Sequence, residues 1–169
     1  LTLLRRMTGI LNWIVRATRP DLSFEMIQLS TKFKGGNVED LAQAQKALTN
    51  LKKTPAYVRF SDVGNLKHAQ IWCFSDAAKH NLNNNKDDTG GYVILLVNPT
   101  TGACTPLDWR ANKIKRRTSS TLGAETLSMC AALNAAVGFK EMIKIMTNHD
   151  LVVKAFIDNK SARDAVYSS

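Results

Sequence analysis

The sequence predicts an α/β fold in which a small helical unit precedes a mixed sheet with covering helices. Three observations predict it. Apolar residues repeat at helical spacing up to about residue 55. Beyond that point, runs of β-favouring residues alternate with one long apolar helix. Two of the β-favouring runs end on an aspartate, which suggests that their ends share one site.

Residues 1–55 are expected to form three helices of a connector, followed by a second domain over residues 56–169. The first helix covers about residues 3–14, Asp21 starts the second, and Gly35-Gly36 ends it. Asn37 is a suitable N-cap for the third, and Thr54-Pro55 stops it. The apolar stripe expected on the third helix is Val38, Leu41, Leu48 and Leu51.

The second domain is expected to be built on a central strand over residues 71–75, covered on both faces because apolar residues fall on both parities. Strands over 92–97 and 103–109 are joined by a hairpin, and Pro106 assigns the second of them to a sheet edge. A helix over 121–147, with a candidate break at Gly138, leads to a strand over 151–157 and a short helix from 159. Residues 80–88 and 110–118 are expected to be loops, and 58–60 a strand or a linker.

The charge favours a polyanionic partner. The net charge of +9 and the pI near 9.7 point to nucleic acid first and to an anionic membrane second. No apolar run approaches ~18 residues, so no membrane span is expected. Cys73, Cys104 and Cys130 show no CxxC spacing and are expected to be small core residues in a reducing compartment.

Three carboxylates are expected to lack a neutralising partner. Asp76 and Asp158 each end an apolar strand, and Glu125 lies on an apolar helix with no cation three or four residues away. If the two strands are parallel neighbours, a right-handed crossover brings the helix between them over the same edge. A hard divalent cation such as Mg²⁺ resolves the repulsion among converging carboxylates, since it prefers oxygen ligands.

Four segments in order carry a resemblance to a known family. They are Phe74-Ser75-Asp76-Ala77, Thr89-Gly90-Gly91-Tyr92-Val93, Ser119-Ser120-Thr121-Leu122-Gly123-Ala124-Glu125 and Ile157-Asp158-Asn159-Lys160-Ser161-Ala162. Together they resemble the ribonuclease H domain of copia-type retrotransposon polyproteins. Upstream, Thr18-Arg19-Pro20-Asp21 and the Ala-Leu-x-x-Leu-Lys-Lys of the third helix look like the segment that joins the reverse transcriptase to that domain.

The resemblance implies a ribonuclease H-like fold and hydrolysis of the RNA strand of RNA–DNA hybrids during reverse transcription. It implies two Mg²⁺ ions, with Mn²⁺ as a substitute, held by four carboxylates, of which Asp76, Glu125 and Asp158 fill three positions. The implied partner in the same polyprotein is the reverse transcriptase, with no membrane partner, and the implied location is intracellular: cytoplasm, retroelement particle or nucleus. The family's fourth acid lies on a final helix. The chain ends eleven residues after Asp158, and Asp164 does not match that position, so a C-terminal truncation that removes the final strand and helix is expected.

Basic residues before the long helix are candidates for contact with nucleic-acid phosphates, although such a loop is also a common solvated surface. They are Lys113, Lys115, Arg116 and Arg117, with Ser119 and Ser120 at the helix N-terminus. His68, His80 and His149 are expected in loops or at the surface, and Trp13, Trp72 and Trp109 in the core. The alternative functions are a non-catalytic module that positions the hybrid for a polymerase, and another nuclease or integrase on the same fold.

Overall fold

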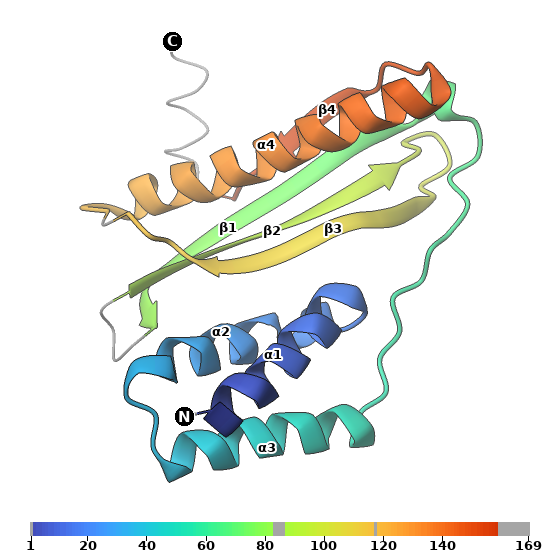
Figure 1. Cartoon of the computed structure of the whole chain (residues 1–169). Coiled ribbons are helices and arrows are strands. Elements are labelled where there is room, and N and C mark those ends of the chain that lie inside the picture. The colour runs from blue at the N-terminus through green and yellow to red at the C-terminus, as the bar shows by residue number, and fades with distance from the viewer. Residues whose placement is uncertain (1, 83–86, 117, 159–169) are drawn as a thin grey trace.

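The computed structural model describes residues 2–82, 87–116 and 118–158, and it has the mixed α/β class that the sequence predicts (Figure 1). Its helical part precedes its sheet in the chain, and the two lie as separate layers in the figure. Short 3₁₀ turns cover Pro20–Leu22, Lys32–Lys34 and Leu66–His68. The longer elements, in order, are α1 (Thr2–Ala17), α2 (Ser23–Thr31), α3 (Val38–Lys53), β1 (Gln70–Leu82), β2 (Asp87–Val97), β3 (Cys104–Lys113), α4 (Thr121–Thr147) and β4 (Val152–Phe156).

The four strands form one mixed sheet in the order β3-β2-β1-β4. β1 pairs antiparallel with β2 and parallel with β4, and β2 pairs antiparallel with β3. The predictions of a central first strand, an edge strand at Pro106 and a parallel fourth strand are therefore confirmed. The expected covering of the first strand on both faces is wrong: Ile71 and Cys73 are buried, whereas Phe74, on the other face, is 38% exposed. At Pro106 the β2–β3 register shifts, which accommodates a residue that has no backbone donor. Residues 58–60 belong to no strand, so the linker alternative holds.

The first two strands extend further than predicted. β1 continues through Leu82, and β2 begins at Asp87, so most of the predicted 80–88 loop is strand. This error has a physical cause. Beyond the apolar core, the backbone N–H and C=O groups of β1 and β2 form hydrogen bonds with each other, and this pairing requires no apolar side chains. Asp76 consequently lies within β1, not at its end.

The long helix α4 covers one face of the sheet and is continuous. It buries Ala124, Ala132 and Ala136 against a core that includes Ile71 and Ile94. Gly138 does not break it, because open space surrounds this position and the helical hydrogen bonds continue past it. Ser120 caps its N-terminus, and Asn148, in the left-handed conformation, ends it.

By length and composition alone, α4 is also apolar enough to cross a bilayer, and 28% of its most apolar 18-residue stretch is buried. A core helix that packs on a sheet passes the same test, so one such helix is weak evidence for a membrane span. The absence of a membrane partner stays a prediction.

The three N-terminal helices pack around their own apolar cluster, which includes Leu4, Leu11, Val15 and Leu29. Asn37 caps α3 through a capping box: its side-chain oxygen accepts a hydrogen bond from the Asp40 amide, and the Asp40 carboxylate accepts one from the Asn37 backbone amide. The stripe predicted on α3 is wrong at its first residue. Val38 is 82% exposed, and the buried residues of α3 are Asp40, Ala44 and Ala47, so the helix presents a different face to the cluster at its start.

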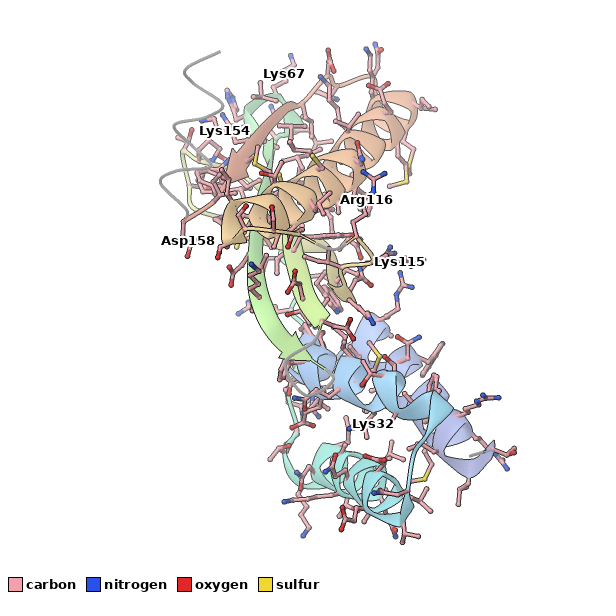
Figure 2. All side chains as sticks on the ribbon, turned by 90° about the vertical axis from the view of Figure 1, so that its left-hand side faces the viewer. Lys32, Lys67, Lys115, Arg116, Lys154 and Asp158 are labelled. Carbon is pink, nitrogen blue, oxygen red and sulfur yellow. The ribbon has the colours of Figure 1, made fainter. Side chains whose placement is uncertain are left out.

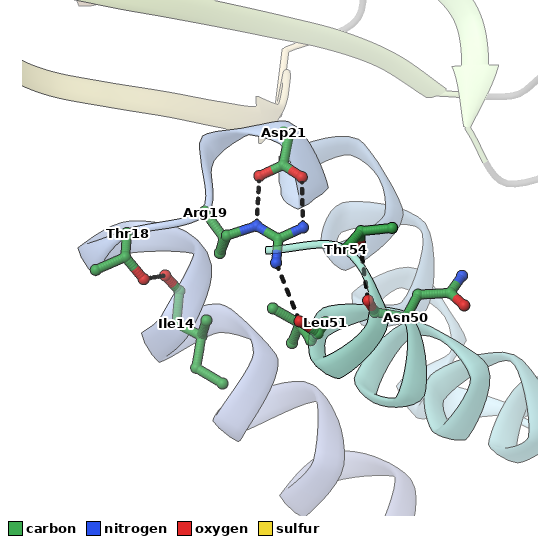
Figure 3. Close-up of polar contacts among 7 residues, drawn as sticks. All are labelled: Ile14, Thr18, Arg19, Asp21, Asn50, Leu51 and Thr54. Carbon is green, nitrogen blue, oxygen red and sulfur yellow. Dashed lines mark hydrogen bonds and ion pairs between the residues drawn. The ribbon is translucent and has the colours of Figure 1, made fainter. Parts of the chain in front are cut away.

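Arg19 holds the corner between α1 and α2 against the end of α3 (Figure 3). Its guanidinium is buried and donates two hydrogen bonds to the Asp21 carboxylate, at 2.9 and 2.7 Å. A third, of 3.4 Å, reaches the carbonyl oxygen of Leu51. The hydrogen bonds from Arg19 lower the pKa of Asp21, and Asp21 raises the pKa of Arg19. Pro20 also starts a 3₁₀ turn, so α2 begins at Ser23 and not at Asp21 as predicted.

Replacing Asp21 with asparagine is expected to lower the free energy of unfolding by about 2 kcal/mol. This is less than the cost of breaking a fully buried pair, because the Asp21 side chain is half exposed. Since the folded-state pKa of Asp21 is lowered, its contribution is present above the ordinary aspartate pKa and disappears as the pH falls through the lowered value. Urea unfolding of both proteins between pH 3 and 7 checks this: the difference should shrink in acid, and a constant difference would contradict the assignment.

The helical unit contacts the sheet through β3. Trp109 is buried, as predicted, and its indole Nε1 donates a 2.8 Å hydrogen bond to the carbonyl oxygen of Val15. Two other tryptophans differ from the prediction: Trp72 is half-buried and Trp13 is 74% exposed, on the side of α1 away from its buried stripe. Cys73 is buried, but Cys104 and Cys130 are exposed, so the core assignment is wrong for both. The division of the chain near residue 55 stays a prediction.

Candidate functional site

Asp76, Glu125 and Asp158 lie together, on β1, on α4 and just after β4. One carboxylate oxygen from each lies within 4.8 Å of the others. The parallel pairing explains how the two aspartates meet: Phe74 is opposite Phe156, and each aspartate follows its phenylalanine by two residues. Glu125, in the second turn of α4, reaches them from the helix that connects the antiparallel strands to β4.

Glu125 is the buried member of this acidic cluster, with 4% of its surface exposed, whereas Asp76 and Asp158 are exposed. Its Oε2 atom is buried and has no hydrogen-bond partner among the described residues. Burial raises the pKa of Glu125, and the negative charges of Asp76 and Asp158 raise it further, while a hydrogen bond from the Ala77 backbone opposes them. The Ala77 amide also donates a 2.7 Å hydrogen bond to Oδ1 of Asp76.

A close contact fixes α4 to the sheet beside the cluster. The hydroxyl of Ser128 lies 2.8 Å from the carbonyl oxygen of Asp76 and 3.0 Å from that of Gly91, two residues that face each other across β1 and β2. The adjacent Gly90 makes this approach possible, since an added Cβ would lie 3.0 Å from Oγ and 3.1 Å from Cβ of Ser128. Sequence reasoning missed Ser128. The available signal was two successive glycines in a β-rich run, which is typical of a close backbone approach.

The basic residues predicted to contact phosphates lie on the other side of α4 from Asp158, as Figure 2 shows for Lys115 and Arg116. Lys113 belongs to β3, not to a loop, and forms a 2.6 Å ion pair with Asp87, because the antiparallel pairing continues past the predicted strand end. Lys115 and Arg116 are exposed. Arg117 lies outside the described residues.

Both serines at the start of α4 accept hydrogen bonds within the fold, Ser120 through its side chain and Ser119 through its backbone carbonyl oxygen. Ser120 accepts a hydrogen bond from the Gly123 amide, and the carbonyl oxygen of Ser119 accepts one of 3.0 Å from Nζ of Lys79. Lys79 therefore links the second half of β1 to the residue before the N-cap of α4.

A groove of about 590 Å³ lies between α4 and the strands β2 and β3, and Ser128 is among the residues that line it. No aspartate or glutamate lines it among the described residues, and four cations do. The residues that line it are Gly90, Tyr92, Arg110, Asn112, Lys113, Ile114, Lys115, Arg116, Leu127, Ser128 and Ala131.

The remaining predictions concern the three histidines and the residues after Asp158. His68 and His149 lie at turns near the surface, which confirms the prediction for both. The side chain of His80 lies outside the described residues, and so do the predicted helix from 159 and Asp164.

The chemistry of the acidic cluster fits a hard cation. All its donors are carboxylate oxygens, and a cation would give Oε2 of Glu125 a partner that no described residue supplies. Comparisons with known proteins neither add to this geometry nor oppose it: no family model, no curated protein and no solved structure matches the chain.

Proposed function

We propose that this chain is a ribonuclease H-like domain that hydrolyses the RNA strand of RNA–DNA hybrids with the help of a divalent cation. The finer fold assignment rests on the strand order, the parallel β4 and the covering α4, which agree with what the sequence resemblance implies. A reverse transcriptase in the same polyprotein and an intracellular location belong to the same proposal.

One observation carries the proposal: Glu125 is buried, its Oε2 atom has no hydrogen-bond partner among the residues that the structure describes, and its carboxylate lies beside those of Asp76 and Asp158. Burying a charged carboxylate without a partner costs several kcal/mol, and two further negative charges lie next to this one. A purely structural domain gains nothing from such an arrangement. Binding a divalent cation would reverse the repulsion that raises the pKa of Glu125.

Asp76, Glu125 and Asp158 would hold the cation. When bound, such an ion supplies activation of water and neutralisation of charge at a phosphate in phosphodiester hydrolysis. The protein's own contribution is to keep the three carboxylates at a fixed spacing on two strands and a helix. Discrimination of RNA from DNA requires contacts to 2′-hydroxyls, and the proposal assigns these contacts to groups near Glu125.

The groove beside α4 suits the backbone of the bound duplex. It is lined by cations, by the apolar residues Ile114, Leu127 and Ala131, and by Ser128, whose hydroxyl bonds to the carbonyl oxygen of Asp76. Phosphates would contact Lys115 and Arg116, while the sugars would pass along the apolar residues.

The test is cleavage of a hybrid that carries a label on its RNA strand, compared with duplex DNA, duplex RNA and single-stranded RNA, in Mg²⁺, in Mn²⁺ and in EDTA. The expected result is cutting of the RNA in the hybrid, dependent on the cation. Equal cutting of duplex DNA would instead assign another nuclease on this fold, and absence of cutting in every cation would leave only a binding module.

The double replacement of Lys115 and Arg116 with alanine is expected to weaken hybrid binding about tenfold at low salt. It should also reduce the slope of log affinity against log salt by about 1.8, because two phosphate contacts are lost. Fluorescence anisotropy from 50 to 300 mM salt measures both quantities. Replacing Lys32 and Lys67, which lie away from the groove in Figure 2, changes the charge equally and should leave the slope almost unchanged.

The second candidate function is a binding module that positions a hybrid without cutting it, and the basic groove is the observation that favours it. That module would show the same salt dependence but would be indifferent to changes in the acidic cluster. Cleavage, not binding, therefore separates the two functions.

A further inference from the structure

The Ser128 hydroxyl lies where the acidic cluster is assembled, although it does not belong to the cluster. Ser128 is 5% exposed and follows Glu125 by three residues, so the two side chains lie on one face of α4. Its hydroxyl contacts the carbonyl oxygen of Asp76, whose side chain is a member of the cluster.

This contact is the side-chain hydrogen bond nearest to the acidic cluster that joins α4 to the sheet, whereas the apolar core and Lys79 hold the helix at other points. Glu125 and Asp76 approach each other from different elements, and their mutual repulsion favours separation of the helix from the strand. The single hydroxyl proton of Ser128 is shared between two carbonyl oxygens, at 2.8 and 3.0 Å, which attaches α4 to β1 and β2 together.

We propose that Ser128 is a positioning residue that sets the spacing of Glu125 from Asp76 and thereby the affinity of the acidic cluster for its divalent cation. The inference rests on the proposed function, because it assumes that the cluster binds a cation. Gly90 is also required for this contact: because it has no side chain, Ser128 can reach the two carbonyl oxygens.

Thr126 provides a matched control on the same helix. It also has a hydroxyl bonded to a backbone carbonyl, at 2.8 Å from the oxygen of Leu122, but this bond stays within α4 and is exposed. Replacing Thr126 with alanine removes a comparable hydrogen bond without loosening the helix from the sheet.

The experiment is a titration of the full chain with Mn²⁺, with the free ion measured by electron paramagnetic resonance. Ser128→Ala is expected to weaken Mn²⁺ binding about tenfold, the usual effect of losing a group that orients a ligand. Thr126→Ala should bind Mn²⁺ as the unaltered chain does. A merely structural role of Ser128 would instead lower the thermal midpoint without cation and leave the Mn²⁺ affinity of the folded protein unchanged.

A second variant covers the case in which Ser128→Ala does not fold. Gly90→Ala introduces a methyl group at 3.0–3.1 Å from Oγ and Cβ of Ser128, and the serine can give way only by losing its bonds or moving the helix. It is expected to weaken Mn²⁺ binding as well.

The outcomes distinguish the inference from the proposed function. The cation site is supported if the unaltered chain binds Mn²⁺ and Asp76→Asn does not bind it. If, in that case, Ser128→Ala or Gly90→Ala binds Mn²⁺ as tightly as the unaltered chain does, the positioning role of Ser128 is wrong. If the unaltered chain and Asp76→Asn bind Mn²⁺ equally, the cation site is wrong and the positioning role falls with it.

Discussion

Replacing Asp76 with asparagine is expected to abolish cleavage of the RNA strand. The loss should be about a thousandfold or more in the rate constant of cleavage of the bound hybrid, which corresponds to ~4 kcal/mol of activation free energy. The introduced asparagine would keep the shape of the side chain and an oxygen that can accept the bond from the Ala77 amide. It would remove one negative charge from a cluster that needs it to hold a cation.

The measurement is single-turnover cleavage of a labelled hybrid at saturating protein, so that weaker binding does not obscure the chemical step. Asp150→Asn is the matched control. Asp150 follows the far end of α4 and pairs with Lys140 and Lys144, so the same change of charge there should leave the rate almost unchanged. Unaltered cutting by Asp76→Asn would show that the acidic cluster does not carry the reaction.

The sequence predicts the acidic cluster because the relevant physics is local. A carboxylate after an apolar run needs a partner, and Asp76 and Asp158 show this without any knowledge of the fold. Their meeting then follows from the parallel pairing of two adjacent strands, which a crossover helix favours. Glu125 joins them because it lies on that crossover helix.

The errors arise where a position is decided by long-range contacts. Trp13 is apolar and lies on an amphipathic helix, but the buried stripe is formed by Leu4, Leu11 and Val15, and Trp13 faces away from it. Periodicity gives the presence of a helix and does not say which of two apolar stripes a partner covers. The extension of β1 past Asp76 has the same origin, since only the pairing with β2 makes those polar residues strand.

Ser128 and Gly90 mark the limit of what the sequence predicts at the site itself. Each residue type is common, and they are 38 positions apart, so nothing local indicates that one faces the other. The two residues meet only because α4 crosses β1 and β2. At that crossing Gly90 leaves room for Ser128, and the Ser128 hydroxyl finds its two carbonyl acceptors.

Replacing Glu125 with glutamine is expected to have opposite effects with and without cation. Without cation, the free energy of unfolding at pH 7 should rise by about 1–2 kcal/mol, because a buried carboxylate that faces two like charges is neutralised. With cation, the stabilisation that Mg²⁺ or Mn²⁺ gives to the unaltered chain should disappear, since a ligand stabilises only the state that binds it. Cleavage should fall as it does in Asp76→Asn.

The pH dependence of the Glu125 effect has a defined sign. The folded-state pKa of Glu125 is raised, so the folded protein holds the proton more tightly than the unfolded chain does. Its contribution to stability is complete below the ordinary glutamate pKa of about 4.3 and is lost as the pH rises through the raised value. In EDTA, the advantage of Glu125→Gln over the unaltered chain should therefore grow with pH across this window, and divalent cation should reverse it. Urea unfolding at several pH values, with and without Mg²⁺, measures both trends. An advantage that is independent of pH, or a stabilisation by Mg²⁺ that survives in Glu125→Gln, would show that Glu125 is not the buried ligand.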